Sequence, residues 1–311
     1  MNIRHPFDDR SRPPHADRSR SPRVIRAAGG FTLVELLVVI AIIGTLIGLL
    51  LPSVQNMREA SRRSVCSNNM KQMGLGLTSF ESARRRFPPG TDDFVRPGEA
   101  SALEHAWSSY ILPHVEESRV STKIDYTKHW NEAGGNDAAS DITLSLYVCP
   151  SGIEMFPGKQ DYGGILGSAI ALSSSTNAAV SWDNGVLRGS RDPASGRFRW
   201  PTAARMISDG LSKTLLVAEA VDRKSHTGAN GDGNTNSSVG SSRWACGTNC
   251  FLHNSPAVND PSVDGFRSRH PHGLNCVFAD GHVVFLSDSV DSDVLVSIST
   301  ANGGEAVPLD L

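Results

Sequence analysis

The sequence lacks the short motifs that carry the commonest hydrolytic and phosphate-transfer chemistry. Its 311 residues contain no Gly-x-Ser-x-Gly nucleophile turn, no Gly-rich phosphate loop and no His-Glu-x-x-His zinc motif. Residues 91–311 also show no long periodic helix pattern, and the chain has no internal repeat. We therefore expect no enzymatic activity and no cofactor.

Beyond the first 30 residues the sequence has no excess of positive charge. Residues 1–30 hold seven Arg, no Lys and three Asp, a net charge of +4. The rest of the chain then carries 23 basic and 29 acidic residues, a net charge of −6. Nucleic-acid binding needs a positive surface on the folded part of a protein, so we expect no nucleic-acid partner. Residues 1–30 are predicted to be a basic, disordered leader.

Charged side chains are nearly absent from residues 31–51, which read FTLVELLVVIAIIGTLIGLLL and contain one ionisable group, Glu35. A helix of these 21 residues is about 31 Å long, enough to span a hydrocarbon core of roughly 30 Å. A secretory signal would be shorter and would end in a small-residue cleavage site, whereas this run stops at Pro52. Because the Arg residues precede it, we predict a single-pass inner-membrane protein with a cytoplasmic N-terminus. The C-terminal part would then be exported to the periplasm or cell surface.

The start of this segment, Gly30-Phe31-Thr32-Leu33-Val34-Glu35, resembles the prepilin-type cleavage and methylation signal of type IV pilins and type II secretion pseudopilins. The resemblance implies that a prepilin peptidase cuts after Gly30, removes the leader and methylates Phe31. It also implies that Glu35 pairs with the N-terminal amine of a neighbouring subunit during assembly. A carboxylate within an apolar span costs about 2.5–3.5 kcal/mol on insertion scales. A plain membrane anchor has no reason to retain a residue with that cost.

An amphipathic pattern follows Pro52. Apolar side chains step by 4, 3, 4 and 3 residues at Cys66, Met70, Met73, Leu77 and Phe80. This stripe predicts that the membrane helix continues outward and packs against the domain. It should end near residue 86, because Phe87 precedes a Pro and resists helical geometry. The expected parts are a leader 1–30, a spine helix 31–86 and a globular domain 87–311.

The exported domain is predicted to be rich in loops and antiparallel strands. Short β-like runs cover residues 143–148, 215–217, 274–278 and 283–286, with Gly, Asn, Ser and Pro clustered between them. Asp280-Gly281 between two of these runs predicts a hairpin with a type I′ turn. The fold class is therefore α+β and pilin-like: a long N-terminal helix packed on an antiparallel β domain.

The spacing His270-x9-Asp280-Gly281 is similar to the closing motif of a large uncharacterised family of bacterial pseudopilin-like proteins. Other stretches resemble that family in the same order: residues 66–74, 87–90, 148–151, 207–214 and 301–305. The resemblance extends over essentially everything after Gly30. It implies an architecture and no known biochemical activity.

Four candidate metal ligands lie close together in the sequence: His270, His272, Asp280 and His282. Asp280 sits at a turn that favours Asp for backbone reasons, and a hairpin would hold His270 and Asp280 far apart. We therefore predict a structural, hydrogen-bonding role for His270, Asp280 and Gly281, and no metal.

A second candidate lies in residues 226–242, which contain almost nothing apolar and are predicted to form a surface loop. Asp232, Asn234 and Asn236 alternate there as in calcium loops. The acidic residue that closes such a loop is missing, so calcium is not predicted.

Five cysteines in an exported domain permit at most two disulfides. Cys246 and Cys250 form a local candidate pair. Cys66 and Cys149 lie in family-like motifs and form a second one, which would tie the spine helix to the domain. Cys276 falls in an apolar strand and is expected to be a buried free thiol.

Two functions remain open on these observations. The chain is either a structural subunit of a pilus or pseudopilus, or an exported binding module that uses the prepilin route only as an anchor. Glu35 favours the first, with other pilin-like subunits, the peptidase and membrane lipid as partners. The large Gly/Ser/Asn-rich domain favours the second.

Overall fold

The computed structural model describes residues 32–95, 97, 101–153, 155–168, 184–191, 195–222, 243–246, 250–253, 258–259 and 265–303. Its contacts divide the chain into two units, one ending at Ser53 and one beginning at Val54.

Helix α1 runs from Leu33 to Arg84 and contains Pro52. Proline has no amide hydrogen, so one backbone hydrogen bond of the helix is missing there. The division between the two units follows directly, between Ser53 and Val54. The helix ends where Arg85 adopts a positive φ of 60°, and this confirms the predicted end near residue 86.

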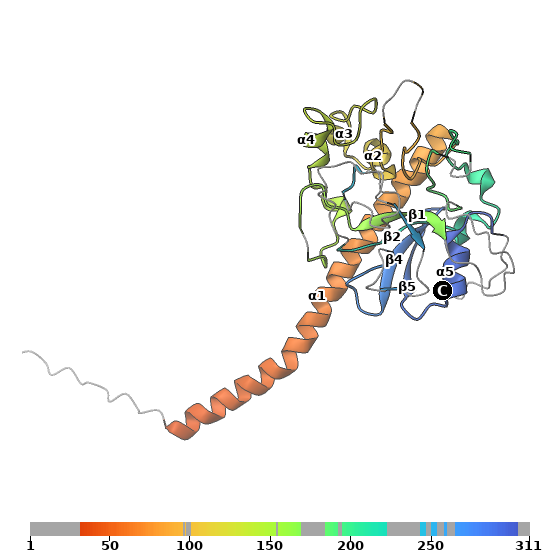
Figure 1. Cartoon of the computed structure of the whole chain (residues 1–311). Helices are drawn as coiled ribbons and strands as arrows, with labels where there is room; N and C mark the ends of the chain where they lie inside the picture. Colours follow the sequence, from red (N-terminus) through yellow and green to blue (C-terminus); the bar gives the residue numbers. More distant parts are fainter. Residues whose placement is uncertain are drawn as a thin grey trace, which may run out of the picture. The chain divides into compact units, whose positions relative to one another are not determined.

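A five-stranded sheet forms the centre of the second unit (Figure 1). Its strands are β1 (Tyr162–Ser168), β2 (Leu215–Glu219), β3 (Cys250–His253), β4 (Gly273–Phe278) and β5 (Val283–Ser287). Their spatial order is β3-β1-β2-β4-β5. Neighbours among β1, β2, β4 and β5 pair antiparallel, whereas β3 lies parallel to β1 at one edge. The α+β class is confirmed, with one parallel strand added to the expected antiparallel sheet.

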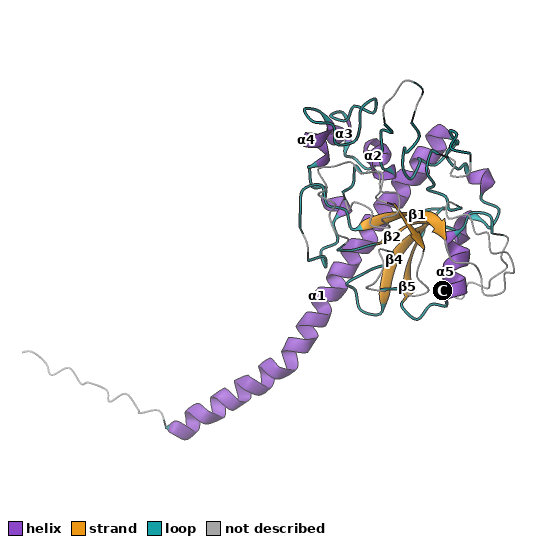
Figure 2. Ribbon diagram, in the orientation of Figure 1, coloured by secondary structure: helices purple, strands orange, loops and turns teal. Residues whose placement is uncertain are grey.

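Hydrophobic side chains pack on both faces of the sheet, and helices contribute to each core (Figure 2). Side chains alternate between the faces of a strand. In β4, Leu274, Cys276 and Phe278 therefore join a core cluster that includes Leu295 of α5 (Ser292–Ser299). Val277 points the other way and joins the core cluster that contains the buried stripe of α1. The sheet thus separates two hydrophobic cores.

The predicted apolar stripe of α1 is confirmed as core. Four of its members are completely buried: Cys66, Met70, Met73 and Leu77. Phe80 is half-buried against the same cluster. The stretch of α1 from Cys66 to Leu77 is therefore a core element of the second unit.

Two glycines let α1 approach its neighbours closely on opposite sides. A Cβ added to Gly74 would lie 2.7 Å from Val277 Cγ2 and 3.2 Å from the carbonyl oxygen of Gly281. One added to Gly76 would lie 2.5 Å from Val115 Cγ1. A mid-helix glycine costs about 1 kcal/mol relative to alanine. At both positions the helix contains glycine despite this cost, because an added Cβ would lie too close to the neighbouring atoms.

Short helices occupy much of the remaining chain. They are α2 (Trp107–Ile111), η1 (Leu112–His114), α3 (Ser118–Ser121), α4 (Asn136–Ser140), η2 (Ser145–Tyr147), η3 (Ala204–Met206) and η4 (Leu211–Lys213). The strand predicted over 143–148 is wrong, because that segment forms the 3₁₀ turn η2. A three-residue turn buries Leu144 and Tyr147 together, and the Tyr147 amide donates to the Leu144 carbonyl oxygen over 2.9 Å. Short apolar runs do not distinguish these two structures.

The strands predicted at 215–217, 274–278 and 283–286 are confirmed as β2, β4 and β5. The β4–β5 hairpin is present, but its turn is not type I′. The amides of Gly281 and Phe278 donate to the carbonyl oxygens of Phe278 and His282, respectively. Among the described residues of the turn only Gly281 has a positive φ, of 87°. The connection is thus a three-residue loop closed by a left-handed glycine, which does not require positive φ at Asp280.

Candidate functional site

The N-terminal end of α1 carries the residue that the sequence singles out, Glu35. Thr32 precedes the helix, and its amide and hydroxyl donate to Glu35 Oε2 over 2.9 and 2.7 Å. The Glu35 amide donates in return to Thr32 Oγ1 over 3.2 Å. This reciprocal arrangement is a capping box, which satisfies amide groups that have no partner within the helix. Glu35 therefore has a local structural role in addition to any role in assembly.

The side chains from Leu33 to Leu51 are all exposed within the described chain. One helix of the described residues, α1, has an 18-residue window apolar enough to cross a membrane, and none of that window is buried. Gly44 and Gly48 have no atom within 4 Å of an added Cβ. A continuous, uncovered apolar surface of this length is suited to lipid. Gly30 and Phe31, the predicted cleavage residues, lie outside the described residues.

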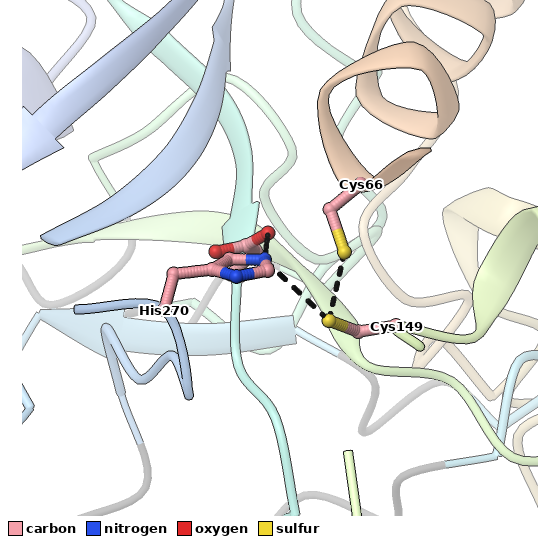
Figure 3. A group of neighbouring side chains, drawn as sticks. Cys66, Cys149 and His270 are labelled. Atoms are coloured by element: carbon pink, nitrogen blue, oxygen red, sulfur yellow. Dashed lines mark hydrogen bonds and ion pairs between the residues drawn. The ribbon is translucent and has the colours of Figure 1, made fainter. Parts of the chain in front are cut away.

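A second site lies within the unit that begins at Val54. Four side chains with metal-ligating atoms meet in its interior: Cys66, Cys149, Glu219 and His270. We call this set the four-residue cluster. Cys66 comes from α1, Glu219 ends β2, and the other two lie in the loops after η2 and before β4. All four are buried, and their ligand atoms lie within 4.8 Å of one another. Figure 3 shows both sulfurs on the same side of the His270 ring.

The distances within the four-residue cluster are short. Cys66 Sγ lies 2.8 Å from Cys149 Sγ, and both cysteines are free thiols in the structure. His270 Nε2 lies 3.7 Å from Cys149 Sγ and 3.3 Å from Glu219 Oε1. Glu219 also accepts hydrogen bonds from the amide and side chain of Asn275, over 3.0 and 2.9 Å. One imidazole nitrogen thus faces a sulfur and a carboxylate at once.

The other nitrogen of His270 has a partner of its own. His270 Nδ1 lies 2.5 Å from Glu59 Oε1, and Arg62 Nε lies 2.9 Å from the second oxygen of Glu59. Glu59 and Arg62 both belong to α1. The contacts from Arg62 through Glu59 to His270 therefore fix the orientation of the imidazole ring and leave Nε2 directed into the cluster.

The charges of the cluster depend on one another. Burial lowers the pKa of His270, but hydrogen bonds to Cys149 and Glu219, with further help from Glu59, outweigh burial and raise it to about 10. The hydrogen bond from Cys66 lowers the pKa of Cys149, with burial opposing and His270 assisting. The same bond and burial together raise the pKa of Cys66. Burial also raises the pKa of Glu59, but its hydrogen bonds to His270 and Arg62 leave it below the ordinary value. These contacts thus favour the protonated imidazole of His270.

The structure describes some of the predicted cysteine pairs more fully than others. It places Cys66 and Cys149 side by side, but as thiols, so their disulfide stays a prediction. The side chain of Cys250 is outside the described residues, and the Cys246–Cys250 pair also stays a prediction. Cys276 is a buried free thiol, 3.5 Å from the carbonyl oxygen of Val284.

The structure separates the two polar members of the His270-x9-Asp280-Gly281 motif. His270 precedes β4 and Asp280 follows it, a separation of roughly 20 Å for six strand residues. Asp280 is exposed and bonds to the amide and ring of His282, over 3.0 and 2.5 Å. The four candidate ligands between His270 and His282 therefore do not form one site. The candidate calcium ligands of residues 226–242 lie outside the described residues.

Sequence reasoning missed Glu219 and Glu59 as members of the second site. Glu219 is a single carboxylate in an otherwise apolar strand, Leu-Leu-Val-Ala-Glu. Burying a carboxylate is costly unless it is paired, so such a residue indicates a buried polar partner. Glu59 is one of several charged residues on α1 and carries no comparable signal.

Two family models match this sequence, one over the N-terminal segment and one over the domain that follows it. A family described as "protein of unknown function (DUF1559)" matches residues 55–293, well over half of the sequence. The chain belongs to this family. The prokaryotic N-terminal methylation motif matches residues 25–51. No curated protein and no solved structure matches the chain.

This member of the DUF1559 family therefore combines a prepilin-type signal with an exported domain of uncharacterised activity. The methylation motif marks it for pilin-type processing and export. The exposed apolar half of α1 is the corresponding membrane anchor.

Proposed function

We propose that this DUF1559 protein is a non-enzymatic structural subunit of a type IV pilus-like or type II secretion pseudopilus-like assembly. One observation carries the proposal: a carboxylate occupies the first turn of an apolar, uncovered helix directly after a prepilin-type cleavage motif. In this proposal the leader stays in the cytoplasm and α1 crosses the inner membrane once. The peptidase leaves Phe31 as the amino terminus.

The physical reason is a charge pair within lipid. The Phe31 amine of one subunit and Glu35 of its neighbour are opposite charges, and their attraction grows as the surrounding dielectric constant falls. Each charge alone would be costly at that depth. The pair therefore favours side-by-side helices over isolated ones.

The capping box defines the competing explanation. If the chain is only an anchored binding module, Glu35 serves its own helix through Thr32 and needs no neighbour. Glutamine at position 35 retains capping ability, because either Glu or Gln completes a capping box. It cannot form the ion pair. Thr32→Ala does the reverse, since it weakens the cap and keeps the charge.

The test compares tagged variants that are co-expressed with untagged wild-type chain and recovered from membranes and sheared surface fractions. Glu35→Ala and Glu35→Gln should be cleaved and inserted but should lose co-purification with the wild type. Thr32→Ala should co-purify normally. Assembly of Glu35→Gln at the wild-type level, with loss in Thr32→Ala, would refute the subunit proposal and favour a plain anchor.

A further inference from the structure

We propose that the four-residue cluster binds Zn²⁺ and that the ion fastens α1 to the sheet of the exported domain. The sequence does not reveal this set, because its four members are separated by 51 to 83 positions along the chain. Only the fold brings Cys66, Cys149, Glu219 and His270 together.

The donor chemistry suits zinc. Two sulfurs, one imidazole nitrogen and one carboxylate oxygen are the ligand types that Zn²⁺ accepts, and four protein ligands complete a tetrahedral structural site. The cluster is buried on all sides, so no coordination position is left open to a substrate. These features indicate a structural ion.

The distances from His270 Nε2 to two of the other ligand atoms are close to those in a zinc tetrahedron. Zinc–ligand bonds of about 2.0–2.3 Å at tetrahedral angles place neighbouring ligand atoms about 3.3–3.8 Å apart. The observed distances from His270 Nε2 are 3.7 Å to Cys149 Sγ and 3.3 Å to Glu219 Oε1. The two sulfurs, at 2.8 Å, need to separate by about 1 Å to become zinc ligands.

The surroundings of His270 match those of a zinc-bound histidine. Such a histidine usually donates its second ring N–H to a carboxylate, which fixes the tautomer and strengthens the ligand. Glu59 accepts from Nδ1 in this manner, and Arg62 holds Glu59. Nε2 is thereby presented to the ion.

The buried charge of Glu219 also bears on cation binding. Glu219 is completely buried, and a buried carboxylate needs compensation. In the part of the chain that the structure describes, the partner that forms an ion pair with it is His270. A Zn²⁺ ion would neutralise Glu219 together with one of the thiolates.

A disulfide between Cys66 and Cys149 is the competing state. A sulfur in a disulfide is no longer a thiolate, and the thiolate is the form of cysteine that binds metal. The zinc-bound and disulfide states therefore exclude each other in one molecule.

The experiment uses the full-length chain, exported by its host, extracted in detergent and purified without reductant or chelator. Metal content is measured by inductively coupled plasma mass spectrometry. Free thiols are counted by alkylation after denaturation. We expect about one zinc per chain, as for a closed four-ligand site, with Cys66 and Cys149 alkylated as thiols. Cobalt exchanged into the site should give thiolate-to-metal charge-transfer absorption.

Variants identify the ligands. Cys66→Ser and Cys149→Ser should lose the zinc, and Glu59→Gln should weaken zinc affinity about 10- to 100-fold, as loss of an orienting carboxylate does. Cys276→Ala is the matched control, because Cys276 is an equally buried cysteine in the core on the other side of the sheet. It should retain zinc at the wild-type level.

Several results would overturn the proposal. A Cys66–Cys149 disulfide in the exported chain with no zinc is one, and zinc that binds only after that disulfide is reduced is another. Retention of zinc by both serine variants would also refute it. If the serine variants do not fold, the zinc content, thiol count and cobalt spectrum of the wild-type chain decide the question.

Discussion

Substitution of Gly281 by alanine and by valine tests how the β4–β5 hairpin packs on α1. Gly281 has a φ of 87°, and a Cβ placed there would lie 3.5 Å from Thr78 Cγ2. That distance is an ordinary contact, so alanine fits but is strained. Gly134 provides a matched control, because its φ is 77° and an added Cβ meets no atom within 4 Å.

The expected magnitudes follow from these two environments. An L-residue in left-handed geometry costs about 1–2 kcal/mol, so Gly281→Ala and Gly134→Ala should destabilise the domain by similar amounts. Valine is more strained at both positions. At Gly281 its γ-methyl groups also enter the space of α1, and overpacking costs about 1–3 kcal/mol. The difference between valine and alanine should therefore be larger at Gly281 by that amount.

Guanidinium unfolding of the full-length chain in detergent measures these differences. All five tryptophans lie between residues 107 and 244, so their fluorescence reports on the exported domain. The denaturant concentration at the unfolding midpoint should change while the m value stays constant. This combination indicates a change of stability alone. Equal valine–alanine differences at Gly281 and Gly134 would refute the packing of the turn on α1.

Three further predictions concern processing, the domain boundary and a buried charge. The mature chain should begin with N-methylated Phe31, which N-terminal mass spectrometry of membrane extracts detects; an intact leader would contradict it. A fragment 54–311 should unfold cooperatively in circular dichroism. A fragment 88–311 should not, because loss of four buried α1 side chains at about 1.5–3 kcal/mol each matches a typical total stability of 5–15 kcal/mol. Lys159 is fully buried, 3.1 Å from Asp161 Oδ1, so Lys159→Met should cost about 3–5 kcal/mol in denaturant titrations. Adding Asp161→Asn should recover part of it, and no recovery would argue against a charge effect.

The sequence predicted the elements whose signals are local. The stripe of α1 from Cys66 to Leu77 reports its own burial, because a 3.6-residue period needs no knowledge of the rest of the fold. Strands β4 and β5 were found because they flank a turn with a left-handed glycine. Strand β1 was missed because three of its seven residues are glycine, which has low strand propensity. Its stability comes from β2 and β3 on either side.

The candidate sites show the same limit. Glu35 is visible in the sequence because a charge within an apolar run is a local anomaly, although its bond to Thr32 adds a role that the resemblance does not imply. The second site depends on contacts between α1, a loop, β2 and the segment before β4. Its histidine was predicted to have a structural, hydrogen-bonding role together with Asp280, which lies at the other end of the strand.

The close approach of Gly74 to the β4–β5 hairpin has a consequence for how the family can diverge. A methyl group can enter position 74 only if Val277 gives up the one that now lies 2.7 Å from that space. The two positions are 203 residues apart in the sequence, yet neither can change size freely while the other stays fixed. A larger residue at position 74 should therefore be tolerated only together with a smaller or displaced side chain at position 277, so the two substitutions should not have additive effects on stability.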